Sequence, residues 1–148
     1  MAGALAASQD VEGRWLAHKR CLAEASDAEA QIVMGVAYRD GSDGPPQVFV
    51  RAAAWFAQAA EQGHPMAQFN MGFLHEHGQV APKDRVLAHM WFNLAGAAFP
   101  WTGDMRVEAF RRRDRLAERL TAEDLRKAQR LATERWETLA GRTTGTAP

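Results

Sequence analysis

The chain has 148 residues, with 18 Lys plus Arg, 18 Asp plus Glu and a formal net charge of zero. This length holds one domain or a short array of repeats, and a chain without net charge has no overall field that attracts nucleic acid or an anionic membrane. Cys21 is the only cysteine, which excludes an intrachain disulfide and a thiolate metal cluster. No segment reaches the ~18 consecutive apolar residues of a membrane span.

The sequence predicts seven helices and no strand, because strand-type alternation of apolar and polar residues is absent. In chain order the expected helices cover residues 11–25, 28–39, 47–62, 65–78, 82–98, 103–119 and 121–140. Asp27 is a suitable N-cap, Gly41 and Gly78 are suitable C-terminal ends, and Pro65 fits a first helical position. Thr121 precedes acidic residues in the spacing of a capping box. We expect residues 1–10 and 141–148 to be disordered tails.

Part of the sequence recurs at an offset of 37 residues. The residues Ala30-Gln31, Gly35, Tyr38 and Gly41 recur as Ala67-Gln68, Gly72, His75 and Gly78, and Trp55-Phe56 recurs 36 residues later as Trp91-Phe92. This period is that of a helical hairpin, and tandem hairpins stack into a solenoid. We therefore predict a repeat domain over residues 11–140, made of a half unit 11–26, repeats 27–63 and 64–99, and diverged capping helices 100–140.

Three residue types have an expected packing role in these hairpins. Gly35 and Gly72 have no Cβ and let one helix backbone approach its neighbour closely. Trp55 and Trp91 are large enough to fill the space between successive hairpins. Cys21 lies on an apolar helix face, and we expect a buried, inert thiol.

The repeated residues resemble the Sel-like repeat (SLR) family of bacterial type, relatives of the tetratricopeptide repeats. The residues that carry the resemblance are Ala30-Gln31, Met34-Gly35, Tyr38, Gly41, Ala52, Trp55-Phe56, Ala59-Ala60 and Gly63, then Ala67-Gln68, Met71-Gly72, Gly78, Asp84, Ala88, Trp91-Phe92 and Ala95. The sequence departs from the family pattern at His75, Gly96 and Phe99. The resemblance implies an all-α, right-handed superhelix of antiparallel hairpins that acts as a protein-interaction scaffold and not as an enzyme.

The first helix of each repeat has a second apolar face that suggests a binding surface. Ile32 and Val36 lie nearly opposite the main apolar face of their helix, and Phe69 and Phe73 occupy the same positions one repeat later. In tetratricopeptide-like superhelices this helix lines the concave surface. Our hypothesis is a partner-binding surface made of Ile32, Val36, Phe69, Asn70, Phe73, Glu76 and His77. The alternative is that the four apolar residues are inter-repeat core.

The sequence lacks the residue spacing of a metal site, a catalytic site or a phosphate-binding site. His75 and His77 are two positions apart on a helix and point in different directions, which argues against a metal site. No nucleophile pattern or phosphate-binding glycine pattern occurs, so we expect no catalytic residue, metal or cofactor. The basic run Arg111–Arg113 is interleaved with acidic residues, and it is either a solvated face or a contact for an anionic partner.

The expected function is an adaptor that presents a concave surface to another protein or peptide, without nucleic acid or membrane insertion, as a monomer or with weak self-association. One alternative is a regulator that restrains a single enzyme or sensor, possibly after export. A further alternative is an envelope-related enzyme. The single thiol favours a reducing compartment such as the cytoplasm, and the sequence leaves the periplasm and secretion open.

Overall fold

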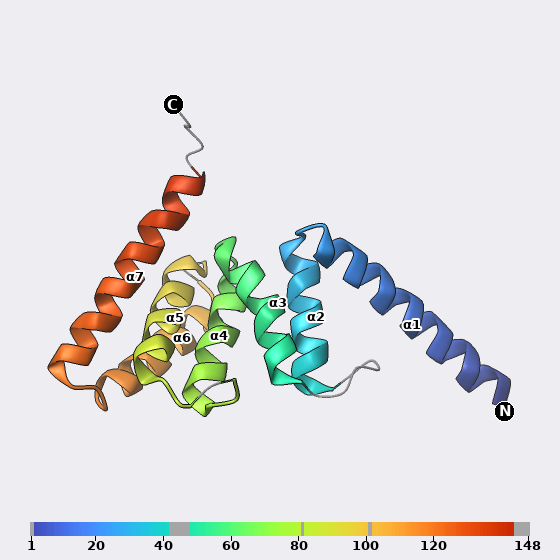
Figure 1. The fold of residues 1–148 in the computed structure, drawn as a ribbon, viewed down its shortest axis with the longest axis horizontal. Coiled ribbons are helices and arrows are strands. Elements are labelled where there is room, and N and C mark those ends of the chain that lie inside the picture. The colour runs from blue at the N-terminus through green and yellow to red at the C-terminus, as the bar shows by residue number, and fades with distance from the viewer. Residues whose placement is uncertain (1, 42–47, 81, 101, 144–148) are drawn as a thin grey trace. The chain divides into compact units, whose positions relative to one another are not determined.

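The computed structural model describes residues 2–41, 48–80, 82–100 and 102–143, and these residues form seven helices and no strand (Figure 1). The helices are α1 (Ala2–Glu24), α2 (Ala28–Asp40), α3 (Phe49–Glu61), α4 (Pro65–His77), α5 (Arg85–Ala98), α6 (Asp104–Ala117) and α7 (Ala122–Thr143). The prediction of an all-α chain with seven helices is confirmed. The expected turn at residues 41–46 lies, beyond Gly41, outside the described residues.

The chain divides into two compact units, Met1–Ala59 and Ala60–Pro148. In the first unit, α1 packs against α2. In the second unit, α4 packs against α5, and α5 packs in turn against α6 and α7. Apart from the contact between α5 and α7, these helices pair with their neighbours in the sequence, as in an array of hairpins.

The predicted helix signals are present at most of the helix ends. Asp27 Oδ1 accepts a hydrogen bond of 2.7 Å from the backbone N–H of Ala30, and Thr121 Oγ1 accepts one of 3.1 Å from Asp124. Gly41 and Gly78 end α2 and α4 with φ angles of 68° and 66°, in the left-handed region that glycine adopts without strain.

Three helix boundaries differ from the prediction by three residues or more. α5 begins at Arg85 and not at Pro82, because the Asp84 side chain accepts a hydrogen bond of 2.9 Å from the Leu87 N–H and so caps the helix three residues later. α1 begins at Ala2, so residues 2–10 are helical where we expect a tail. Alanine has the highest helix propensity, and it accounts for four of the first seven residues.

The C-terminal tail is also shorter than expected. α7 continues to Thr143, which includes residues 141–143 of the predicted tail, and residues 144–148 lie outside the described part. The longer helix follows from the apolar stripe of Leu131, Trp136 and Leu139, which continues at helical spacing to this end.

Phenylalanine, and not tryptophan, lies against the repeat glycines. A Cβ on Gly35 would lie 2.6 Å from Cδ1 of Phe56, and one on Gly72 would lie 3.0 Å from Cδ1 of Phe92. Both rings are fully buried, whereas Trp55 is half-buried. Successive residues of a helix differ by about 100° in direction, so only one residue of each Trp-Phe pair faces the glycine. Phe56 therefore fills the space beside Gly35, whereas the prediction for Trp55 concerned the space between successive hairpins.

Cys21 is exposed and not buried as expected. The face of α1 that packs within the first unit is marked by the buried residues Leu16 and Ala23. Cys21 is two positions before Ala23 and therefore points to the other side of the helix.

Candidate functional site

The candidate surface of the second unit is built on an aromatic cluster between α4 and α5. Phe69 of α4 meets Phe92 of α5 edge-on, with ring centroids 5.2 Å apart and an interplanar angle of 68°. Phe69 and Phe73 pack against a buried cluster formed by Ala88, Phe92 and Leu116. Both rings remain half-buried, so each ring packs in the repeat and is still partly exposed at the surface.

Arg112 of α6 covers this aromatic cluster. Its guanidinium lies 5.7, 5.4 and 5.8 Å from the ring centroids of Phe69, Phe73 and Phe92. These distances are within the range of cation–π attraction. The Arg112 side chain is 22% exposed, so a single arginine forms the outer layer over three rings.

Two carboxylates hold Arg112 in this position. Arg112 Nη1 donates to Glu76 Oε2 of α4 at 2.8 Å, and Arg112 Nε donates to Glu108 Oε1 of α6 at 2.8 Å. Burial raises the pKa of Glu108, but the hydrogen bonds and charges of Arg112 and Arg111 outweigh it and hold that pKa below its ordinary value. Glu108 therefore stays ionised near neutral pH and fixes the arginine between two helices.

His77 extends the surface at the end of α4. Its ring stacks on Phe73 with centroids 4.0 Å apart and an interplanar angle of 28°. Its Nδ1 lies 2.9 Å from the carbonyl oxygen of Phe73, which accepts the hydrogen bond when that nitrogen carries the proton. His77 is exposed, so this edge of the surface offers a polar ring on an aromatic base.

The seven residues of the predicted surface are placed differently. Phe69, Phe73, Glu76 and His77 lie together around Arg112. Asn70 is only 4% exposed, and its Nδ2 donates to the Met66 carbonyl at 2.9 Å, so it supports α4 from within. The other two belong to the first unit, where Ile32 is 8% exposed and Val36 is half-buried.

Arg112 and Glu108 are the residues that the predicted surface lacks. Their spacing of four on a helix identifies them as a local ion pair, and the basic run at residues 111–113 marks the segment. The contact with Glu76 joins residues 36 positions apart in the sequence, and no local pattern predicts it.

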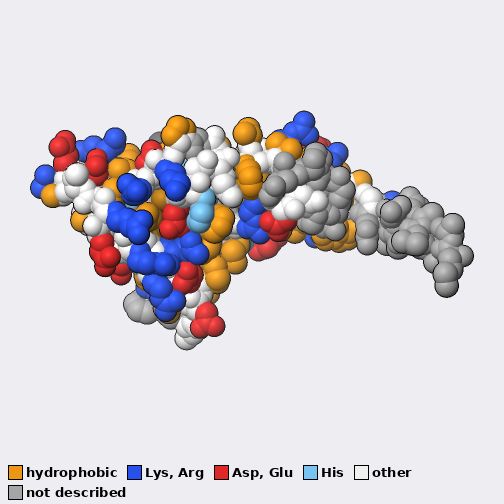
Figure 2. All heavy atoms as spheres, turned by 90° about the horizontal axis from the view of Figure 1, so that it is seen from below, with side chains coloured by type: hydrophobic (Ala, Val, Ile, Leu, Met, Phe, Trp, Pro, Cys, Tyr) orange, Lys and Arg blue, Asp and Glu red, His pale blue; other side chains and the backbone are white. Residues whose placement is uncertain are grey.

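Charges of both signs alternate over α6. Arg111, Arg112 and Arg115 all pair with Glu108, and Arg113 pairs with Asp114. Figure 2 shows this kind of distribution, with Lys and Arg side chains interspersed with Asp and Glu beside hydrophobic patches. The surface of α6 is therefore mixed in charge.

The histidines of the described part do not form a metal site. Within residues 2–41, 48–80, 82–100 and 102–143, no three His, Cys, Asp or Glu side chains come together as metal ligands. His89 is buried, which lowers its pKa, and the charge of Arg113 lowers it further while Asp114 opposes this. Burial also lowers the pKa of His75, against the charge of Asp84.

Comparison with protein families decides what kind of repeat this is. The family model described as the Sel1 repeat matches residues 28–64 and residues 65–98. The chain contains two Sel1 repeats. The contacts of Gly35 and Gly72 with phenylalanine thus lie within the two Sel1 repeats.

Two solved structures are similar to this Sel1-repeat chain. A protective antigen of uropathogenic Escherichia coli strains, which displays an SLR fold, is 28% identical with a TM-score of 0.73, over 90% of this chain and 28% of that chain. A Sel1 repeat protein from Oxalobacter formigenes is 25% identical with a TM-score of 0.59, over 81% of this chain and 44% of that chain. The helical-repeat solenoid architecture is therefore confirmed.

Two curated relatives come from Arabidopsis thaliana. The ERAD-associated E3 ubiquitin-protein ligase components HRD3A and HRD3B are 39% identical over 70 residues and 38% identical over 72 residues. These matches cover 47% and 49% of this chain but only 10% and 12% of the relatives, so the chain spans about a tenth of their length.

Sel1 repeats mediate protein–protein interaction, and this type of repeat is a scaffold that is generally not enzymatic. In the described part of the chain, none of the helices combines the length and the apolar character that crossing a bilayer requires.

Proposed function

We propose that this Sel1-repeat chain is an adaptor that binds another protein or a peptide through the α4–α6 surface. We define this surface by Phe69, Phe73, Glu76, His77, Glu108 and Arg112. The observation that carries the proposal is Arg112, which covers three phenylalanine rings while it pairs with Glu76 at 2.8 Å. Aromatic residues and arginine are enriched at the energetic centres of protein interfaces.

The surface favours a partner segment with an apolar anchor and a carboxylate. Half-buried Phe73 and exposed His77 form an aromatic step that an apolar side chain covers. Arg111 next to it is 63% exposed, and an arginine fork binds a carboxylate in a bidentate way. We infer an amphipathic helix or an extended segment as the bound element.

The relatives support a role within a larger assembly. HRD3A and HRD3B are named as components of an ERAD-associated E3 ubiquitin-protein ligase, and their similarity to this chain lies in segments of about 70 residues. A short repeat segment that binds another protein within an assembly is consistent with these relatives and with the α4–α6 surface.

Affinity capture from a native extract tests this proposal, with wild type, Phe73→Ala and His77→Ala as baits. Val50→Ala is the matched control, because Val50 is an exposed apolar residue of α3 and belongs to the first unit. We expect a captured protein that is lost with Phe73→Ala and His77→Ala and kept with Val50→Ala. Circular dichroism of each bait checks that the helices remain folded. Loss of capture with the control alone contradicts the proposed surface.

The number of captured partners separates the alternatives. Several partners that compete for the α4–α6 surface support an adaptor. One partner at fixed stoichiometry, whose activity falls on binding, supports a regulator that restrains one enzyme or sensor. Turnover of an envelope substrate by the purified chain, without any partner, supports an enzyme and contradicts the proposal.

A further inference from the structure

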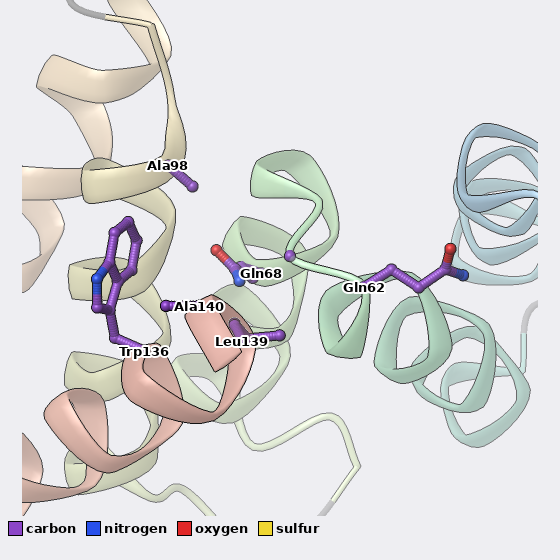
Figure 3. A pocket seen from close by; sticks show the side chains of 7 residues that line it. Gln62, Gln68, Ala98, Trp136, Leu139 and Ala140 are labelled. Atoms are coloured by element: carbon purple, nitrogen blue, oxygen red, sulfur yellow. The ribbon is translucent and has the colours of Figure 1, made fainter. Parts of the chain in front are cut away.

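The second unit contains a cavity of about 250 Å³ whose lining is distinct from the α4–α6 surface. It lies where the start of α4, the end of α5 and the last part of α7 meet (Figure 3). Its lining includes Gly63, Gln68, Ala98, Trp136, Leu139 and Ala140. In Figure 3 the Gln62 side chain extends away from these residues, so the labelled lining is apolar apart from the Gln68 amide and the indole nitrogen of Trp136.

Gln68 brings an unused hydrogen-bond acceptor to this cavity. Its Nε2 donates to the carbonyl oxygen of Ala60 at 3.4 Å, which requires the amide nitrogen to face the end of α3. The amide oxygen Oε1 consequently faces the other way, toward Ala98 and Trp136 in Figure 3. This atom is buried and has no hydrogen-bond partner among the residues that the structure describes.

The equivalent glutamine of the first repeat shows that the amide orientation is part of the repeat. Gln31 Nε2 donates to the Ala23 carbonyl at 3.1 Å, over the same separation of eight residues as Gln68 and Ala60. The nitrogen of each glutamine thus satisfies a carbonyl at the end of the preceding helix. A buried acceptor without a donor is unfavourable, so the oxygen of Gln68 is a site that a donor from outside would stabilise.

The lining restricts the chemistry of the group that fits. The described residues that line the cavity include no Lys, Arg, Asp or Glu, which favours a neutral group because burial of an unpaired charge is costly. The volume is larger than the ~150 Å³ of a cavity that holds benzene, and it is suited to one bicyclic aromatic side chain. Trp136 is 46% exposed and presents a ring for aromatic packing.

We propose that this cavity binds the indole ring of a tryptophan carried by a partner protein. The indole N–H donates to Gln68 Oε1, and the ring packs against Trp136 and Leu139. An indole has one donor and no acceptor, so it satisfies the glutamine oxygen and leaves no second polar group unpaired, whereas a phenol brings an acceptor as well. Because Oε1 is covered in the unliganded chain, the side chains that cover it move aside when the indole enters. This proposal does not rest on the function proposed for the α4–α6 surface.

Titration of the ¹⁵N-labelled full chain with indole and with 1-methylindole tests the proposal by NMR. The two probes have nearly the same size and apolar surface, but only indole has an N–H. We expect indole to shift the side-chain signals of Trp136 and Gln68 and to bind about tenfold more tightly than 1-methylindole, since one hydrogen bond to a buried acceptor is removed. Equal affinity for the two probes, or shifts that avoid both side chains, overturns the proposal.

Variants show which residue causes the difference in affinity between the two probes. Gln68→Ala removes the acceptor and is expected to abolish the difference between the probes, whereas Gln31→Ala removes the equivalent amide of the first repeat and retains the difference. If Gln68→Ala does not fold, Ala140→Phe is the second variant, because it fills the cavity from the exposed face of α7 and is expected to block indole. Indole binding that survives Ala140→Phe contradicts the site.

A third probe tests whether the cavity accepts an indole ring that is attached to a peptide backbone. N-acetyltryptophanamide carries the same ring on a peptide-like backbone. We expect it to bind at least as tightly as indole and to shift the same signals. Binding of indole without binding of N-acetyltryptophanamide overturns the assignment to a tryptophan of a partner protein.

Discussion

Gly35 of α2 lies directly against the ring of Phe56 in α3, so close that a Cβ at residue 35 would lie 2.9 Å from Cζ of the phenylalanine. The same arrangement occurs between Gly72 and Phe92, and again between Gly96 and Phe110 of α6, where the Cβ would lie 2.5 Å from Cε1. A helix glycine that receives an aromatic ring of a following helix is therefore the recurring packing element of this chain.

The substitution Gly35→Ala is expected to destabilise the first unit. Alanine favours a helix by about 1 kcal/mol over glycine, but the added Cβ displaces the Phe56 ring, and overpacking of this kind costs about 1–3 kcal/mol. Gly13→Ala is the matched control, because Gly13 lies in α1 and a Cβ added there would meet no atom within 4 Å. Thermal unfolding followed by circular dichroism should show a lower Tm for Gly35→Ala and an unchanged or higher Tm for Gly13→Ala.

The neighbouring residues Trp55 and Phe56 should differ in their contribution to stability. Phe56 is fully buried, and its replacement by alanine leaves a cavity that costs about 3–5 kcal/mol. Trp55 is half-buried, so Trp55→Ala is expected to cost less than Phe56→Ala despite the larger side chain. Urea denaturation of the two variants measures both losses. A greater loss for Trp55→Ala would contradict the packing at Gly35.

Arg135 is expected to anchor α7 to the rest of the second unit. Its guanidinium lies 4.6 Å from the ring centroid of Trp91, and it forms an ion pair with Glu61. Arg135→Ala should therefore increase amide hydrogen exchange in α7, and Arg135→Lys should restore only part of the protection, because a planar guanidinium stacks on an aromatic ring better than an ammonium does.

The control for this prediction is Arg130→Ala. Arg130 is an exposed residue of α7 that pairs with Glu134 at 3.8 Å within the same helix. An exposed pair of this kind contributes about 0–1 kcal/mol, so hydrogen exchange in α7 should change little. Equal deprotection by Arg130→Ala and Arg135→Ala would argue against Arg135 as the anchor.

The stability of the chain should fall as the pH decreases below ~6.5, the ordinary histidine pKa. Burial lowers the pKa of His89 and of His75 in the folded chain. Between the folded and the unfolded pKa the unfolded chain binds more protons, so acidification favours unfolding. Measurements of Tm from pH 7.5 to 5 should show a smaller decrease for His89→Gln than for wild type. An identical pH dependence would contradict a buried, neutral His89.

Local signals predicted the repeat, the helices and most of their ends. Asp27 and Thr121 cap helices as expected because capping depends on residues within one turn. The repeat pattern could not tell whether Trp55 or Phe56 faces Gly35. Both residues recur, and only the rotation of α3 about its axis decides which one does. Gly96 and Phe110 were not recognised as an equivalent pair, because Phe110 lies in the diverged part of the sequence.

The candidate surface was predictable only along single helices. The spacing of Phe69 and Phe73 placed them on one face of α4, and the spacing of Glu108 and Arg112 placed these on one face of α6. That Arg112 covers the two rings and pairs with Glu76 depends on how α4 and α6 pack, which the sequence pattern does not contain. Asn70 shares the stretch of sequence but points inward to the Met66 carbonyl.

Site-specific photo-crosslinking tests the interaction surface most directly. A p-benzoylphenylalanine is introduced at residue 73 in one variant and at residue 50 of the first unit in another, and each is irradiated with the partner obtained by affinity capture. The account predicts a covalent product at residue 73, next to His77 and Arg112, and none at residue 50. A product that forms only at residue 50, or equally at both positions, would contradict binding through the α4–α6 surface.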